Sequence, residues 1–280
     1  AAKKGSKLIV MDPRGHALKK HATHMLQFNP GSDVALLNSI MNVIIEENLF
    51  NEEYIKKQTT GFDELQKHLK KYPPELMEEQ TGIDSNMIRE VARLYAKTKK
   101  GIIFWGMGVS QHVHGTDNAR CLISLALMTG NVGKKGSGLH PLRGQNNVQG
   151  ASDAGLIPMM YPDYQLVEKN DKQNFFEKFW NTSLDSKKGL TVVEIMDAVH
   201  ENTIKGMYIL GENPAMSDPD LNHAREALQM LEHLVVQDIF LTETATYADV
   251  IFPASAWPEK NGTATNTNRQ VQMGRKALDA

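Results

Sequence analysis

The stretch GMYILGENPAMSDPDLNHAREALQMLEHLVVQDIFLTETATYADVIFP, residues 206–253, decides the fold. It contains three short apolar runs, at 206–210, 233–238 and 249–253, whose composition predicts β-strands. Residues 219–231, between the first two runs, have the composition of a helix. Strand and helix in alternation are typical of a parallel sheet covered by helices, so we expect an α/β fold.

The same alternation occurs nearer the N-terminus. Residues 7–11 and 101–105 predict strands, and 31–49, 84–100 and 117–129 predict helices, the first capped by Ser32 or Asp33. Shorter helices are expected within 51–82, and the spacing of Thr191 and Glu194 predicts a capping box at the start of a later helix. The region 131–170 is predicted to be a long loop. We therefore expect two Rossmann-like α/β domains, 1–142 and 143–280, with mainly parallel sheets flanked by helices.

Composition excludes several classes of protein. The chain of 280 residues has 31 Lys and Arg against 33 Asp and Glu, so its net charge of -2 gives no sign of a nucleic-acid partner. No apolar run approaches a membrane span, and no signal peptide is visible. The single cysteine, Cys121, allows neither an internal disulfide nor an iron–sulfur cluster, and its apolar surroundings predict a buried, inert thiol rather than a catalytic thiolate. His112 and His114 alternate, but no third metal ligand lies near them in the sequence.

Polar side chains follow the predicted strands. Ligands of open parallel sheets bind beyond the carboxyl ends of the strands, where these segments lie. Ordinary polar turns are the alternative, and GMGVSQ (106–111) is only a partial match to a dinucleotide-binding loop. The segments are DPRGH (12–16), GMGVSQ, GENP (211–214), Gln237–Asp238, and PASAWPEKNGT (253–263) with Lys260.

The segment HPLRGQNNVQGASDAG (140–155) consists mostly of amides and glycines around one cation, Arg143. Glycine lets a backbone approach a ligand closely, and amides both donate and accept hydrogen bonds. Two interpretations remain: a loop that closes on a polar ligand, or a solvated loop in which Arg143 pairs with a neighbouring carboxylate. We expect this loop to be mobile, because few of its side chains can enter a core.

These motifs resemble those of a known family. GMGVSQ, LMTGNVGKKGSGLHPLRGQNNVQGASDAG, YPDYQ, LGENPAMSDPD, VVQDIFLTETATYADVIFPASAWPEKNGT and NRQVQ occur in this order and together resemble the large subunit of molybdenum- or tungsten-dependent formate dehydrogenases, which are molybdopterin oxidoreductases. The resemblance covers essentially the whole chain, and RGQNNVQG is its most specific part. It implies the two central α/β domains of that subunit, each binding one molybdopterin dinucleotide, with the opening strands of the first domain missing.

The resemblance also implies roles for individual residues. The cofactor would be a pair of molybdopterin guanine dinucleotides carrying Mo or W. Arg143 would be the catalytic residue that holds the formate carboxylate, and Gln145 would bond the cofactor beside the metal. The other cofactor-binding residues would be Asp12, Pro13, Arg14, Gly31, Ser32 and Asp33 for one dinucleotide, Met107, Gly108 and Gln111 for a pterin, and Gly211, Asn213, Gln237, Asp238 and Lys260 for the second dinucleotide.

The resemblance further implies parts that this chain lacks. In the family a cysteine-rich segment holds a [4Fe–4S] cluster, and a cysteine or selenocysteine ligates the metal. We therefore expect the chain alone to be inactive and the complete enzyme to have electron-transfer subunits, in the cytoplasm or alternatively in the periplasm. Two other functions remain open: a cofactor-free structural subunit of a respiratory complex, and a nucleotide-binding module that acts alone.

Overall fold

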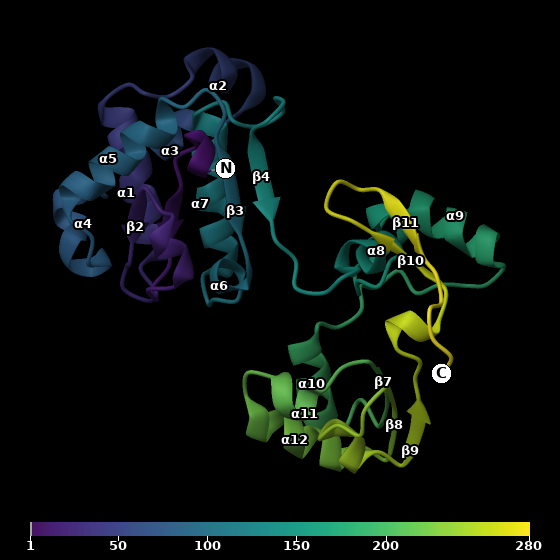
Figure 1. Cartoon of the computed structure of the whole chain (residues 1–280). Helices are drawn as coiled ribbons and strands as arrows, with labels where there is room; N and C mark the ends of the chain where they lie inside the picture. Colours follow the sequence, from purple (N-terminus) through teal and green to yellow (C-terminus); the bar gives the residue numbers. More distant parts are fainter. Residues whose placement is uncertain (1) are drawn as a thin grey trace. The chain divides into compact units, whose positions relative to one another are not determined.

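The computed structural model describes residues 2–280, and the chain divides into two compact units (Figure 1). The first unit ends at Gly144, and the second spans Gln145–Ala280. Among the helices of residues 2–280, none is long and apolar enough to span a bilayer.

The first unit contains two pairs of short parallel strands among helices (Figure 1). β1 (Ile9–Met11) pairs with β2 (His24–Leu26), and β3 (Ile102–Trp105) pairs with β4 (Gly138–Pro141). The helices are α1 (Asp33–Glu46), α2 (Glu52–Gln58), α3 (Phe62–Leu69), α4 (Pro74–Thr81), α5 (Ser85–Ala96), α6 (Met107–Ser110) and α7 (Gly115–Met128), with short 3-10 helices η1 (Ala2–Lys4) and η2 (Ala17–Lys20).

Helix α1 forms the centre of the first unit's core. It contacts α3, α4, α5 and α7, and its residues from Ala35 to Ile44 are all buried. Burying a Leu, Ile, Val or Met side chain stabilises a fold by about 1.5–3 kcal/mol. Because α1 buries several such side chains, it is the main source of hydrophobic stabilisation in the first unit. The helices predicted within 31–129 are confirmed. Pro74 begins α4, and Gly82, with φ 71°, ends it in the left-handed conformation that glycine tolerates.

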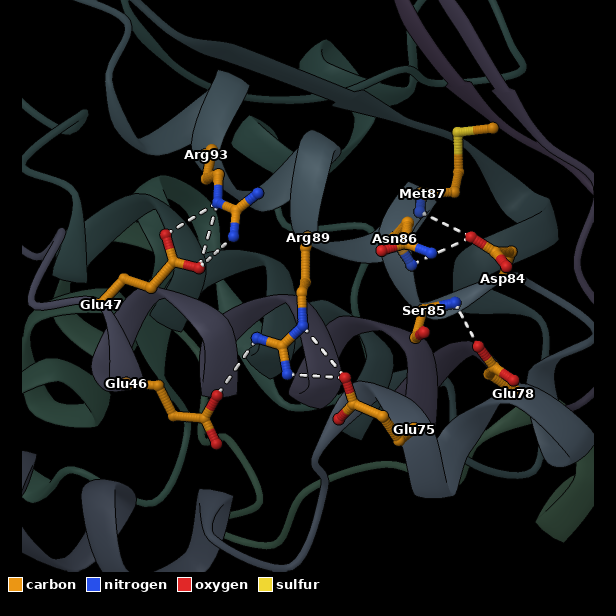
Figure 2. A network of polar contacts seen from close by, with 10 residues as sticks. All are labelled: Glu46, Glu47, Glu75, Glu78, Asp84, Ser85, Asn86, Met87, Arg89 and Arg93. Atoms are coloured by element: carbon orange, nitrogen blue, oxygen red, sulfur yellow. Dashed lines mark hydrogen bonds and ion pairs between the residues drawn. The ribbon is translucent and has the colours of Figure 1, made fainter.

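Ion pairs fasten α5 to two neighbouring helices (Figure 2). The Arg89 guanidinium donates to Glu75 of α4 at 2.8 Å and to Glu46 of α1 at 3.3 Å. Arg93 donates to both carboxylate oxygens of Glu47, which follows α1, at 2.7–3.0 Å. These contacts join three helices on the outer surface of the unit.

The second unit is built around a three-stranded parallel sheet. β8 (His233–Asp238) pairs with β7 (Gly206–Leu210) on one side and β9 (Val250–Pro253) on the other, which confirms the three predicted strands. The predicted capping box is also confirmed: the Thr191 amide donates to Glu194 at 2.7 Å. The helical elements of the region that contains this sheet are α10 (Val192–His200), α11 (Pro214–Ser217), α12 (Leu221–Met230), η4 (Thr244–Tyr247) and η5 (Trp257–Glu259).

The predicted loop at 131–170 is wrong for much of its length. It contains β4, α8 (Val148–Asp153), and the antiparallel pair β5 (Met160–Tyr161) and β6 (Gln165–Leu166), with η3 (Pro162–Tyr164) between them. β4 has the sequence GLHP, which lacks strand-forming residues and becomes a strand only by pairing with β3. Helix α9 (Asn170–Trp180) follows, and a second antiparallel pair, β10 (Gly262–Thr265) and β11 (Val271–Gly274), lies near the C-terminus. The larger sheet and both strand pairs of the first unit are parallel, so the expected α/β class is confirmed.

Candidate functional site

The turn after β1 contains the first group of predicted site residues. The Asp12 carboxylate accepts the Arg14 amide at 2.7 Å, and His16 Nε2 lies 3.7 Å from its other oxygen. Pro13 and Arg14 are exposed, and the Arg14 guanidinium makes no ion pair among residues 2–280. The strand end therefore presents one carboxylate held by the turn and one cation directed to solvent.

The start of α1 contains the second group. Gly31 has φ 83°, and Ser32 occupies the N-cap position as predicted. The Ser32 hydroxyl does not cap the helix, however, because it donates to the Asn29 carbonyl at 2.7 Å. Asp33 is nearly buried, and His112 Nε2 lies 3.9 Å from its carboxylate. This contact brings the end of the α6 segment to the start of α1.

The ends of β3 and β4 lie side by side. Trp105 pairs with Pro141, and the Leu142 amide extends the pairing with a 2.7 Å bond to the Trp105 carbonyl. The chain then leaves both strands in the same direction, through Met107, Gly108 and Gln111 on one side and Arg143 on the other. The structure thus brings the Arg143 segment next to GMGVSQ, and the side chains of Met107, Gln111 and Arg143 are exposed.

Arg143 makes no hydrogen bond or ion pair with any residue that the structure describes. Within the first unit, no carboxylate pairs with Arg143 as that alternative requires. A guanidinium remains charged at any working pH and presents donors in a planar fork that matches a carboxylate. The Arg143 guanidinium is therefore available to bind a carboxylate from solution.

In the second unit, the ends of β7 and β8 meet. The Gly211 amide donates to the Gln237 carbonyl at 2.9 Å. The Gln237 side chain bonds the Tyr208 hydroxyl, and Asp238 Oδ1 accepts the amides of Ile239 and Phe240. Gly211, Gln237 and Asp238 are therefore grouped at the carboxyl end of one sheet.

Asn213 lies at the same end but is engaged by the protein. Its carboxamide oxygen accepts the amide and the hydroxyl of buried Thr244 at 3.0 and 2.7 Å, and its nitrogen donates to Glu243 at 2.8 Å. This last bond is the main reason that the pKa of Glu243 is lowered. The bonds join the turn after β7 to the segment after β8. Sequence reasoning missed Thr244, because it is one of three threonines within 242–246 and nothing in the sequence distinguishes it from the other two.

Lys260 is not joined to this group. It is exposed after η5 and, within the described part of the chain, forms no ion pair.

The amide side chains of the RGQNNVQG segment differ in exposure and in hydrogen bonding. Gln145 and Asn146 are exposed without hydrogen bonds to residues 2–280, whereas Asn147 bonds to β10, and Gln149 bonds to Asp153 and Tyr164.

Cys121 is only partly buried in α7. Desolvation, with a smaller effect of Asp117, raises its pKa to about 11, which favours the neutral thiol over the thiolate. Within residues 2–280, no three His, Cys, Asp or Glu side chains are grouped so that they could hold a metal ion, and His112 and His114 instead lie near Asp33 and Asp117.

Comparison with known proteins gives consistent matches. The family described as Molybdopterin oxidoreductase matches residues 1–280. The chain is 50% identical over 279 residues to the F420-dependent formate dehydrogenase subunit alpha of Methanocaldococcus jannaschii, covering 100% of this chain and 41% of that protein. It is 41% identical over 280 residues to formate dehydrogenase H of Escherichia coli, covering 100% of this chain and 39% of that protein.

A solved structure shares the fold. Acetylene hydratase from Pelobacter acetylenicus superposes with a TM-score of 0.77 at 22% identity, over 99% of this chain and 41% of that one. The chain thus spans about two fifths of the length of each of these three proteins.

Proposed function

The chain belongs to the molybdopterin oxidoreductases, and on this basis we propose that it is part of the catalytic subunit of a formate dehydrogenase, which oxidises formate to carbon dioxide. The names of its relatives support this assignment, since those in Methanocaldococcus jannaschii and Escherichia coli are formate dehydrogenases matched along the whole of this chain. Among single residues, Arg143 gives the main support, because it is exposed just beyond β4 and makes no ion pair among residues 2–280.

The cofactor would be a pair of molybdopterin guanine dinucleotides with Mo or W. The residues present fit such a group, because the strand ends offer open backbone and unpaired cations. A Cβ built on Gly31, Gly108 or Gly211 would meet no atom within 4 Å, so a flat ligand can approach the backbone there. Arg14 and Lys260 are free to neutralise phosphates.

Each unit contributes its own set of contacts in this proposal. Asp12, Pro13 and Arg14, with Gly31, Ser32 and Asp33, would hold one dinucleotide in the first unit. Met107, Gly108 and Gln111 would pack against a pterin. In the second unit Gly211, Gln237, Asp238 and Lys260 would hold the other dinucleotide, Asn213 would brace its turn, and Gln145 would bond the cofactor beside the metal.

Arg143 would orient the substrate. Formate has one charge and two oxygens, and the planar donors of a guanidinium can bind both oxygens at once. The bound metal centre would supply the redox chemistry by accepting electrons from formate. Arg143 itself moves no proton, because a guanidinium stays protonated; its role is to bind and orient the carboxylate.

The electrons would leave through groups that this chain does not contain. We propose a [4Fe–4S] cluster bound elsewhere in the enzyme, because a cluster usually needs four thiolates and the chain has one cysteine. Electron-transfer subunits would be the partners, in keeping with the name "subunit alpha" of the relatives. We propose the cytoplasm as the location of the enzyme, with the periplasm as the alternative.

The test is to purify the full-length protein and measure metal, pterin and formate-dependent reduction of an artificial dye. We expect stoichiometric pterin with Mo or W, and dye reduction that needs formate. Full-length protein without metal and pterin would instead support a cofactor-free structural subunit. Tight binding of free guanine nucleotide without pterin would support a nucleotide-binding module.

The isolated 280-residue chain should not oxidise formate. Cys121 is a poor replacement for the metal's thiolate, because burial raises its pKa to about 11 and it lies within α7. Sustained, metal-dependent turnover by the pure chain would contradict the proposal.

A further inference from the structure

One amide of the RGQNNVQG segment bonds to a part of the chain more than a hundred residues away. Asn147 Nδ2 donates to the Thr263 carbonyl at 3.1 Å, and Asn147 Oδ1 accepts the Thr265 amide at 2.9 Å. Figure 1 shows α8, which begins just after Asn147, beside the β10–β11 hairpin. Both bonds lie within the second unit.

The two bonds occupy the edge of β10 that faces away from β11. The backbone groups of successive strand residues point to opposite edges, and Asn266, the residue after Thr265, donates its amide to the carbonyl of Gln270, which precedes β11. The Asn147 carboxamide therefore supplies one donor and one acceptor to the open edge, as a neighbouring strand would. Aspartate lacks the donor, and alanine lacks both groups.

Asn147 makes these bonds in place of a local one. It is the N-cap residue of α8, and asparagine is among the best N-cap residues, yet its side chain makes no capping bond. The carboxamide is turned toward β10 instead.

Gly150 leaves the space that this conformation needs. A Cβ built on Gly150 would lie 2.2 Å from Asn147 Oδ1 and 2.8 Å from its Cγ. Any larger residue would force the Asn147 side chain to move. Asn147 and Gly150 thus form a pair, three residues apart, in which the second permits the orientation of the first.

We propose that Asn147 is a positioning residue for cofactor binding, and this inference rests on the proposed function. Gln145 precedes Asn147 by two residues, and Lys260 precedes Thr263 by three. The Asn147 bonds therefore fix the segment with Gln145 against the strand that follows Lys260. Asn147 does not itself touch the cofactor; it holds in register two residues that do.

The experiment uses the full-length enzyme with the variants Asn147→Ala, Asn147→Asp and Gly150→Ala. Asn146→Ala is the matched control, because Asn146 is the adjacent exposed amide and has no hydrogen-bond partner among residues 2–280. Three quantities are measured: hydrogen exchange at the Thr265 amide, pterin and metal per protein, and kcat and KM for formate in the cofactor-loaded fraction.

In Asn147→Ala and Gly150→Ala, exchange at Thr265 should be about tenfold faster, as expected for one lost hydrogen bond. Both variants should also lose pterin, and the loaded fraction should show kcat reduced about tenfold or more by the displaced Gln145. KM for formate should change less than kcat. Asn146→Ala should match the wild type in every measurement.

The Asn147→Asp variant separates positioning from a general effect on folding. Its protonated carboxyl group has a donor and an acceptor and can replace the amide, whereas its carboxylate repels the Thr263 carbonyl. Relative to the wild type, its pterin content and kcat should therefore recover only as the pH is lowered toward about 4, where an ordinary aspartate carboxyl group begins to be protonated. A variant that was merely misfolded would not recover in this direction.

Two outcomes would overturn the inference by itself. One is unchanged exchange at Thr265 in Asn147→Ala, and the other is pterin content and kcat equal to those of Asn146→Ala. A wild-type enzyme without pterin would be a different result, because it would remove the proposed function together with this inference.

Discussion

Arg89 and Arg143 belong to the same unit but differ in what surrounds their guanidinium groups. Arg89 contacts the carboxylates of Glu46 and Glu75, so its donors are engaged within the fold (Figure 2). Arg143, just beyond β4, has no such partner among residues 2–280. The same side chain is therefore used in two ways.

The difference shows how a structural charge and a functional charge can be distinguished. A guanidinium that has its carboxylates inside the fold contributes to stability and has few donors left for a ligand. A guanidinium directed to solvent at a strand end contributes little to stability but can bind a carboxylate that arrives from solution. The comparison predicts that the two arginines affect different measurements.

The largest effect is expected from Arg143 in the full-length enzyme. Arg143→Ala should lower kcat/KM for formate by about ten- to hundredfold, the equivalent of a charge-assisted hydrogen bond worth about 1.5–3 kcal/mol. Arg143→Lys should give a smaller loss, because it keeps the charge but not the planar fork. Pterin content and melting temperature should barely change.

Arg120→Ala is the control, since Arg120 is an exposed arginine of α7 with one weak pair to Asp117 at 3.5 Å. Its kinetics should equal those of the wild type. Near-normal kinetics in Arg143→Ala would remove Arg143 from the active site. Kinetics that decline only in proportion to lost pterin would make its role structural.

The strands and helices could be predicted because their signals are local. The run at 206–210 becomes β7, and Thr191 with Glu194 makes a capping box within four residues. β4 could not be predicted, because GLHP has no strand propensity of its own and forms a strand only by pairing with β3, more than thirty residues earlier.

Some features of the candidate site could likewise be predicted from the sequence, and others could not. The grouping of Gly211 with Gln237 follows from the parallel sheet, which the sequence predicts. Whether an amide side chain is exposed or bonded within the fold does not follow from the sequence, because Gln145 and Asn147 carry the same functional group in the same segment, RGQNNVQG. Only the folded chain brings Asn147 to Thr263, and Asn213 to Thr244.

A smaller effect, on stability alone, is expected from Arg89. Arg89→Met removes both ion pairs but keeps an apolar stem, and exposed pairs contribute about 0.2–1 kcal/mol each, so the free energy of unfolding should fall by about 1 kcal/mol. Arg120→Met should cost clearly less. Urea unfolding gives both values. The kcat/KM of Arg89→Met should stay normal, and a large kinetic defect at full stability would break the distinction between the two arginines.

The smallest effect concerns pH and the Arg93–Glu47 pair. The hydrogen bond from Arg93 is the main reason that the pKa of Glu47 lies below its usual 4.5. A carboxyl whose pKa is lowered by folding stabilises the protein above its unfolded pKa and loses that contribution as the pH falls through its folded pKa. The wild type should therefore be more stable than Glu47→Gln by about 0.5 kcal/mol at pH 7, as for an exposed pair, and this advantage should vanish as the pH falls well below 4.5.

Urea unfolding at pH 7, 5 and 3 measures the difference in the free energy of unfolding. Glu79→Gln is the control, because Glu79 of α4 is exposed and makes no ion pair among residues 2–280. An advantage over Glu47→Gln that persisted unchanged at pH 3 would show that the Glu47 carboxylate is not the group that Arg93 stabilises, and the contrast with Arg143 would then rest on Arg89 alone.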